Sequence, residues 1–168
     1  MQVYVLDSNF FIQAYRIYYP PDVAVNFWLK IRELASQGRI ISIDKVRDEL
    51  YQGNDALKDW CKNNLPTDFF RATDVPEVLA AYRSVIGWAI SRNSHYVPNA
   101  INEFLEATEA DAFLTAYCLA AADSRILVTQ EISEPNRKNK VKIPDACNAV
   151  GVSYVDTITM FRQLGATF

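Results

Sequence analysis

Short apolar runs that alternate with helical segments constrain the fold of this chain more than any other feature. The run VYVL, residues 3–6, is continuous and rich in β-branched residues, which is typical of a strand buried on both faces. RIISI (39–43), RILVT (125–129) and VSYVD (152–156) are three further runs of this kind. Their alternation with helices predicts an α/β fold, with three α/β/α layers and a mostly parallel central sheet of four or five strands.

The segments between these runs carry apolar residues at helical spacing. In residues 108–122, Thr108 is a good N-cap and the rest is Ala-rich and apolar on almost every side, which predicts a central helix. No linker or repeat interrupts the 168 residues, so we expect a single domain over residues 1–168. The other predicted helices span residues 23–37, 44–53, 55–65, 76–92, 98–107, 144–151 and 157–165.

Composition argues against several classes of function. The formal charge of −3 gives no general attraction for nucleic acid, so any such contact requires a local basic patch. The three cysteines are never in CxxC spacing and His95 is the only histidine, which argues against a zinc site and leaves His95 as the only base for a Ser-His or Cys-His pair. No apolar run reaches the length of a membrane span, so we expect a soluble, cytoplasmic protein without membrane contact.

Four acidic residues fall where a parallel sheet would gather them. Asp7 directly follows the first apolar run, Glu49 lies on the helix after the second, and Glu131 comes just past the third. Asp111 lies in the first turn of the Ala-rich helix. Because ligands bind beyond the carboxyl ends of parallel strands, this fold could place all four around one cleft. Glu109 is left out, because it would face away from Asp111 if both lay on the helix.

Each of these acids also has a structural explanation. The helix dipole favours an acid in a first turn, which would account for Asp111 alone. Glu49 could belong to a solvated helix face, and Glu131 could be an ordinary loop residue. Asp7 is the hardest to explain in this way, because a buried run leads directly into it. The functional interpretation therefore depends on the four residues as a set.

Gathering carboxylates is unfavourable unless their charge is neutralised. Two like charges about 4 Å apart repel by roughly 4 kcal/mol at an effective dielectric constant of about 20. An all-oxygen ligand set predicts Mg²⁺ or Mn²⁺, which suits phosphodiester hydrolysis with either one or two metal ions. Ser8, Asn9 and Thr129 are then expected to hydrogen-bond the carboxylates or a metal-bound water.

At these acids the sequence resembles the PIN-domain nucleases, over nearly the whole chain. VLDSNFFI matches the family's first strand and its Asp, here Asp7. SIDKVRDEL matches the family pattern through Ser42, Val46, Glu49 and Leu50, and ADAFLTAYCLAAA matches it at Asp111. LVTQE keeps the family's Thr as Thr129 but has Glu131 where an Asp is usual. The segments IPDACNAVGV and FRQLG indicate a less characterised PIN-like branch.

The resemblance implies a metal-dependent endoribonuclease in which Asp7, Glu49, Asp111 and Glu131 hold Mg²⁺ or Mn²⁺. It further implies an RNA substrate, a frequent role as the toxin of a toxin–antitoxin pair, an antitoxin that inserts into the acidic cleft, and frequent homodimers. Glu131 adds one methylene relative to Asp, and Asp145 in IPDAC follows soon after, so Asp145 stays open as an alternative metal ligand and fourth acid.

Two further groups of residues have both a functional and a structural interpretation. The loop NRKNKVK could form an RNA-binding rim that grips phosphates, or it could be a solvated basic loop. Tyrosines in AYRIYYPP could stack on unpaired bases, or could form a partly buried linker. The basic residues are Arg137, Lys138, Lys140 and Lys142, and the tyrosines are Tyr15, Tyr18 and Tyr19.

Other functions remain as alternatives to a ribonuclease. A catalytically degenerate PIN-like module would bind a protein partner or RNA without cutting, which the Glu131 departure and the acidic charge would permit. A phosphatase of the haloacid-dehalogenase type would need an Asp where this chain has Asn9. There is no Gly-rich phosphate loop to support a nucleotide-binding switch.

Overall fold

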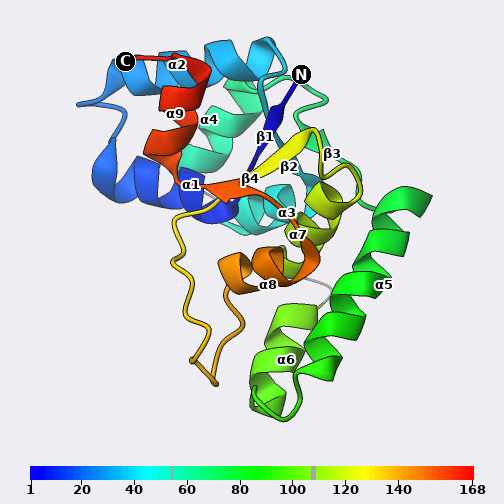
Figure 1. The fold of residues 1–168 in the computed structure, drawn as a ribbon. Helices are drawn as coiled ribbons and strands as arrows, with labels where there is room; N and C mark the ends of the chain where they lie inside the picture. Colours follow the sequence, from blue (N-terminus) through cyan, green and yellow to red (C-terminus); the bar gives the residue numbers. More distant parts are fainter. Residues whose placement is uncertain (54, 107–108) are drawn as a thin grey trace.

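The computed structural model describes residues 1–53, 55–106 and 109–168. Its centre is a five-stranded sheet in the order β3-β2-β1-β4-β5, in which every neighbouring pair is parallel. The predicted α/β fold with a parallel central sheet is thereby confirmed (Figure 1). The strands are β1 (Val3–Leu6), β2 (Ile40–Ile43), β3 (Phe70–Arg71), β4 (Arg125–Val128) and β5 (Tyr154–Val155).

The strand order places a change of direction at the middle of the sheet. From β1 the chain steps outward to β2 and β3, and it then returns to the other side of β1 to add β4 and β5. In the register of this central pair, Leu6 lies opposite Val128, so the residues that follow these two strands leave the sheet side by side. In open parallel sheets, a crevice for ligands forms at such a point.

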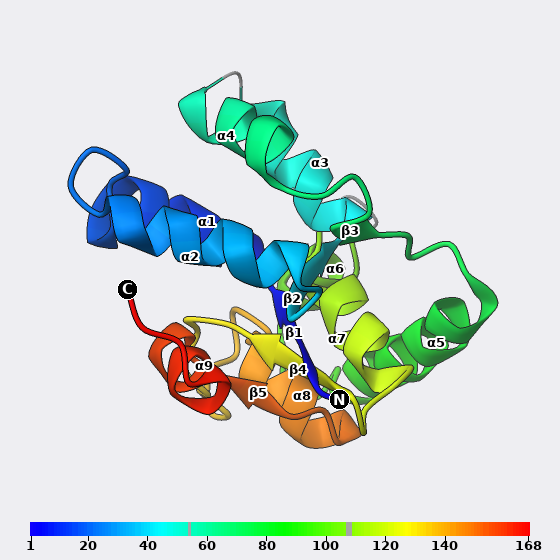
Figure 2. The same cartoon turned by 90° about the horizontal axis from the view of Figure 1, so that it is seen from above.

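Helices cover both faces of the sheet (Figure 2). On one face, the rings of Phe27 and Phe161 lie 5.8 Å apart and those of Trp28 and Trp60 lie 4.7 Å apart, which joins α2 to α9 and to α4. This layer consists of α1 (Ser8–Gln13), the π-helix η1 (Ala14–Tyr18), α2 (Val25–Ser36), α3 (Asp44–Gln52), α4 (Ala56–Asn64) and α9 (Thr157–Leu164). The opposite layer consists of α5 (Pro76–Ser91), α6 (Pro98–Leu105), α7 (Asp111–Leu119) and α8 (Ile143–Val150).

The Ala-rich helix α7 is central, as predicted, because Ala112 to Cys118 are all buried. It begins at Asp111, after Ala110, which is also buried. The expected N-cap, Thr108, lies outside the described residues. Within the described part of the chain, no helix has both the length and the apolar character that crossing a bilayer requires.

A long irregular segment, residues 129–142, connects β4 to α8 and is called the β4–α8 loop here. The sequence predicted a polar loop at this place, and the backbone follows that prediction. The loop is tied to the chain between α5 and α6, since the backbone N–H of Val97 donates to the carbonyl of Lys138 at 3.0 Å. It leaves the carboxyl edge of the sheet and extends below it in Figure 1.

Candidate functional site

Asp7 lies where β1 ends and α1 begins, and only 1% of it is exposed. The hydroxyl of Ser8 donates to its carboxylate at 3.3 Å, and that of Thr129 does so at 3.5 Å. Burial raises the pKa of Asp7 to about 6, and the negative charges of Glu131 and Glu49 act in the same direction. The backbone N–H of Asn9 and the Ser8 hydroxyl lower the pKa, but by less. Two of the three predicted supporting residues therefore reach Asp7 through side chains, and Asn9 acts through its backbone.

Asp111 opens α7 on the other side of the sheet edge and is half-buried. Burial raises its pKa well above the ordinary value, and the charges of Asp7, Glu131 and Glu49 add to this effect. The ammonium group of Lys140 acts in the opposite direction. Since the charges of Glu49 and Glu131 act on both Asp7 and Asp111, the four predicted carboxylates lie within electrostatic range of one another at one edge of the sheet. We call Asp7, Glu49, Asp111 and Glu131 the carboxylate cluster.

Glu49 is held in place by the start of α7. Its Oε1 accepts a hydrogen bond from the backbone N–H of Ala110 at 2.9 Å, although Ala110 and Glu49 are 61 residues apart in the chain. Glu49 therefore does not belong to a freely solvated helix face. This bond fixes α3 relative to α7 and sets Glu49 beside Asp111.

Glu131 forms hydrogen bonds at both ends of the β4–α8 loop, with Thr129 at its start and with Ile143 just after it. Its backbone N–H donates to the Thr129 hydroxyl at 3.1 Å, and its Oε2 accepts from the backbone N–H of Ile143 at 2.8 Å. Its Oε1 lies 3.8 Å from the Nζ of Lys140. The carboxylate of Glu131 is thus already partnered on both oxygens, by a helix N-terminus and by a lysine.

Asp145, the alternative fourth acid, is placed differently. It is buried in the first turn of α8, where it accepts hydrogen bonds from the Ser133 hydroxyl at 2.5 Å and from the backbone N–H of Glu134 at 3.1 Å. It lines a separate pocket with Trp88 and Tyr96, and it is not among the charges that shift the pKa of Asp7 or Asp111. The structure therefore keeps Asp145 apart from the carboxylate cluster and gives it the role of anchoring the β4–α8 loop.

The basic residues of the β4–α8 loop are largely paired with acids. Arg137 lies 2.8 Å and Lys142 lies 3.6 Å from Glu134, while Lys140 pairs with Glu131. Lys138 is exposed. The loop thus does not present four free cations, and RNA binding by this rim stays a prediction. Lys140 has a clearer role, because it is the cation that faces the carboxylate cluster.

Glu109 was left out of the predicted site, and the structure places it near the cluster. The pKa of its carboxyl is raised by partial burial and by the charges of Glu49, Glu103 and Glu106, and it is lowered by Lys140. Because α7 begins only at Asp111, the argument from helical facing did not apply to Glu109. A better prediction of where the helix starts would have kept Glu109 as a neighbour of the site.

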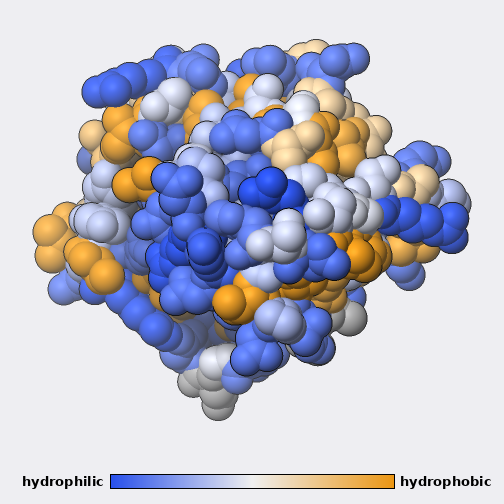
Figure 3. Space-filling view, turned by 60° about the horizontal axis from the view of Figure 1, so that its bottom comes forward, coloured by the Kyte–Doolittle hydropathy of each residue, from blue (hydrophilic) through white to orange (hydrophobic). Residues whose placement is uncertain are grey.

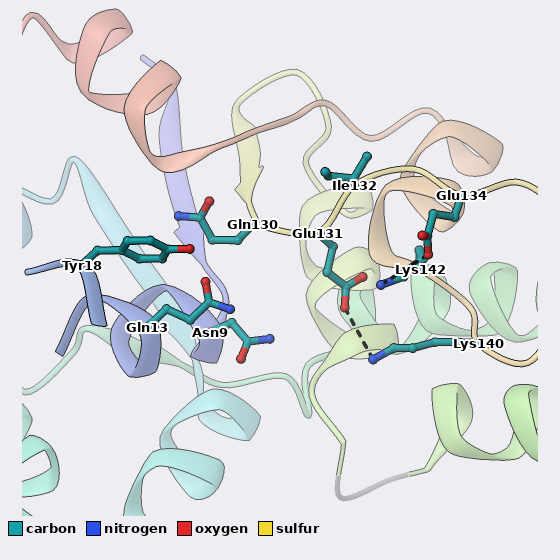
Figure 4. Close-up of a pocket in the computed structure, with 9 residues that line it drawn as sticks. All are labelled: Asn9, Gln13, Tyr18, Gln130, Glu131, Ile132, Glu134, Lys140 and Lys142. Atoms are coloured by element: carbon teal, nitrogen blue, oxygen red, sulfur yellow. Dashed lines mark ion pairs between the residues drawn. The ribbon is translucent and has the colours of Figure 1, made fainter. Parts of the chain in front are cut away.

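A pocket of about 480 Å³ opens beside the carboxylate cluster (Figure 4). One wall comes from α1 and η1 and carries Asn9, Gln13 and Tyr18, and the other comes from the β4–α8 loop and carries Glu131 and Lys140. In Figure 3, which brings the lower side of Figure 1 forward, hydrophilic side chains gather around the centre of this face. The sequence predicted the acids at this edge but not Gln13 or Gln130, which also line the pocket.

The carboxylate cluster fits a divalent metal ion by its chemistry, although its side chains are not yet arranged around one. Across the described residues, no three or more His, Cys, Asp or Glu side chains already converge in an arrangement that holds a metal ion. All donors of the cluster are carboxylate oxygens, which hard divalent ions prefer. Burial raises the pKa of Asp111, and the charges of the other three acids raise it further against the single opposing charge of Lys140. Asp7, Glu49, Asp111 and Glu131 would hold such an ion once their side chains closed around it.

Comparison with known proteins gives one match. The sequence model of a family described as "Domain of unknown function (DUF4411)" matches residues 4–168, which is nearly the whole chain. No curated protein and no solved structure matches the chain.

Proposed function

The chain belongs to the DUF4411 family, and from the geometry of its carboxylate cluster we propose that it is a metal-dependent endoribonuclease of PIN type. Its substrate would be RNA, and its cofactor Mg²⁺ or Mn²⁺. A role as a toxin, an antitoxin partner and homodimerisation stay predictions. The observation that carries the proposal is that the charges of Glu49 and Glu131 act on both Asp7 and Asp111 at the point where the strand order changes direction.

The physical support is that the fold concentrates negative charge at one edge of the sheet, where like charges act unfavourably on one another. Asp7 is buried, and the charges that act on it from Glu131 and Glu49 are both unfavourable. The ammonium group of Lys140 lies 3.8 Å from Glu131 and opposes only part of the repulsion at Asp111. A divalent ion would relieve the remainder, and hard divalent ions prefer oxygen donors of this kind.

Side-chain and backbone groups of this chain would orient the carboxylates around such an ion. A bound divalent ion would polarise the phosphate and supply the nucleophilic water. Ser8 and Thr129 orient the carboxylate of Asp7 through their hydroxyl groups. The Ala110 N–H orients Glu49, and the Ile143 N–H orients Glu131. Burial of Asp7 keeps bulk water away from one side of the site.

The test is RNA cleavage by purified protein with Mn²⁺ and a single-stranded RNA. We expect Asp7→Asn and Asp111→Asn each to lower the cleavage rate by about 100-fold or more, because each removes a charged oxygen donor from the metal site. Asp123→Asn changes an exposed acid that precedes β4, at the opposite end of this strand from the cluster, and should cleave like the wild type. Equal cleavage by all four proteins would point to a contaminating nuclease and contradict the proposal.

The bonds of Glu131 favour a second candidate function, the degenerate module that binds a partner or RNA without cutting. Both oxygens of Glu131 already have protein partners, so a metal ion would compete with the positive charge of Lys140 for this carboxylate. Calorimetry with Mn²⁺ separates the two candidates. Binding that Asp7→Asn abolishes and Asp123→Asn preserves supports the nuclease, whereas no binding by the wild type supports the degenerate module.

A further inference from the structure

The pocket beside the carboxylate cluster has a wall that carries no acid. Asn9 and Gln13 from α1 and Tyr18 from η1 form this wall, and Gln130 faces the same space from the opposite side (Figure 4). Among the described residues, the side-chain amides of Asn9 and Gln13 form no hydrogen bond with other protein groups. They therefore remain available to a ligand, and they can both donate and accept.

Tyr18 differs from the two tyrosines beside it in the sequence. Tyr15 packs against Trp28 with ring centroids 5.6 Å apart, and Tyr19 stacks on Phe27 at 4.3 Å. Tyr18 has 61% of its surface exposed and lines the pocket. The linker interpretation thus holds for Tyr15 and Tyr19. The ring of Tyr18 lies tilted beside that of Tyr19, with centroids 6.4 Å apart, and is otherwise exposed towards the pocket.

The backbone geometry explains why Tyr18 is set apart. Residues Ala14–Tyr18 form a π-helix directly after α1, which changes the direction of the side chains relative to a continuous α-helix. Two hydrogen bonds fix the end of this π-helix at Tyr19. The backbone N–H of Tyr19 donates to the carbonyl of Ala14 at 2.8 Å, and the indole N–H of Trp28 donates to the carbonyl of Tyr19 at 2.6 Å. Short π-helical segments are frequent at functional sites.

The charges of the pocket narrow the chemistry of its ligand. Glu131 and Glu134 are matched by Lys140 and Lys142, at 3.8 and 3.6 Å, so the charged side chains of the pocket sum to zero. A free phosphate would gain little there. A flat, neutral group with a hydrogen-bonding edge would gain from the ring of Tyr18 and from the amides. The volume of about 480 Å³ lies in the usual range for small-ligand sites.

We infer that this pocket binds one unpaired nucleobase of the substrate, next to the phosphate at the carboxylate cluster. Tyr18 stacks on the base, and the amides of Asn9 and Gln13 contact its edge. The inference rests on the proposed function for the identity of the polymer as single-stranded RNA, whose unstacked bases are read in this manner. Tyr18 would thus bind a base of the RNA, whereas the carboxylates would hold the metal ion.

The test measures binding of a short fluorescent single-stranded RNA by anisotropy, with Ca²⁺ present and the RNA checked on a gel for integrity after each titration. We expect Tyr18→Ala to weaken binding by about 5- to 100-fold, the range that loss of one stacked base gives. Tyr18→Phe keeps the ring and should bind within about 3-fold of the wild type. Ile17→Ala, at a neighbouring side chain that is 66% exposed and does not line the pocket, is the matched control.

A series of RNAs with one abasic position each then identifies the base that the pocket holds. With the wild-type protein, the RNA that lacks this base should bind more weakly than the intact RNA. With Tyr18→Ala, the intact and abasic RNAs should bind equally, because the stacking between the base and Tyr18 is already absent. Wild-type affinity in Tyr18→Ala, equal losses for the abasic RNA in both proteins, or no RNA binding at all would overturn the inference.

These outcomes are separable from failure of the proposed nuclease. If Tyr18→Ala loses binding while no RNA is cut with Mn²⁺, the base pocket stands and the cleavage proposal fails. If RNA is cut and Tyr18→Ala binds and cuts like the wild type, the cleavage proposal stands and the base pocket fails.

Discussion

At Asp7, burial and neighbouring negative charges act in the same direction, and the consequence is a dependence of stability on pH. The pKa is raised from 3.8 to about 6, so the folded chain holds this proton up to a higher pH than the unfolded chain does. Stability from this residue is therefore greatest below about pH 4 and is lost as the pH rises through about 6. Asp111 contributes with the same sign.

We accordingly expect Asp7→Asn to stabilise the metal-free protein at pH 8 and to have little effect at pH 4. A shift of about two pKa units corresponds to about 3 kcal/mol of unfolding free energy. Urea unfolding at both pH values in EDTA measures the difference, with Asp123→Asn as the exposed control. If Asp7→Asn were instead less stable than the wild type at pH 8, the hydrogen bonds that Asp7 accepts would stabilise the fold by more than its buried charge destabilises it.

At the scale of elements, one buried carboxylate holds the middle of the β4–α8 loop. Asp145 accepts from the Ser133 hydroxyl and the Glu134 N–H, so the first turn of α8 holds the middle of the loop in place. Glu131 lies earlier in the same loop and is fixed separately to the Ile143 N–H. Both acids therefore fix the same loop, Asp145 from the first turn of α8 and Glu131 from within the loop.

Asp145→Ala should loosen this loop without removing a metal ligand. We expect a loss of about 1–3 kcal/mol in unfolding free energy, because two hydrogen-bond donors lose their buried acceptor. Hydrogen exchange should show faster exchange at the Glu134 N–H, and Asp145→Asn, which keeps one acceptor oxygen, should lie between Ala and wild type. Mn²⁺ affinity should fall about 10-fold or more in Glu131→Gln and much less in Asp145→Asn. The reverse order would make Asp145 the fourth ligand.

Several elements were predictable from the sequence because their signals are local. β1, β2 and β4 are continuous buried runs, and the acids that follow or neighbour them were expected at one edge of a parallel sheet. β3 was not predicted, because two residues, Phe70 and Arg71, carry no periodic pattern. The π-helical turn at Tyr18 also has no sequence signal, since it arises from packing of its neighbours against α2.

The sequence predicted which residues form the candidate site better than it predicted the hydrogen bonds that position them. Asp7 could be placed because a buried strand ends at it. The hydrogen bond from Ala110 to Glu49 could not, since it joins residues 61 positions apart whose separation in space depends on the packing of α3 against α7. The separation of Asp145 from the carboxylate cluster likewise depends on the path of the β4–α8 loop, which no periodicity encodes.

At the scale of the whole molecule, the carboxylate cluster links folding to metal concentration. An ion that binds only the folded state stabilises it by about 2.7 kcal/mol at 100 times its dissociation constant. For a chain of this size, that corresponds to a rise of roughly 5–10 °C in Tm. Because the pKa values of Asp7 and Asp111 are raised, protons compete with the ion as the pH falls.

We therefore expect Mn²⁺ to raise the Tm at pH 8 and to raise it much less at pH 5. Differential scanning fluorimetry with NaCl at the same ionic strength separates binding from charge screening, and excess EDTA should restore the original Tm. Asp7→Asn should abolish most of the rise. If Mn²⁺ raised the Tm by the same amount at both pH values, or if NaCl raised it as much as Mn²⁺ did, the carboxylate cluster would not bind a metal ion specifically.

The β4–α8 loop carries Glu131 and Lys140 together, and these two side chains face each other at 3.8 Å. Any partner that draws this loop away from the sheet thus removes an anion and its counter-cation in one movement. The displaced pair has no net charge, but Asp7 would no longer feel the charge of Glu131, which raises its pKa, and Lys140 has no matching effect on Asp7. Displacement of the loop would therefore leave Asp7 a stronger acid, and the edge would lose one of its four carboxylates at the same moment.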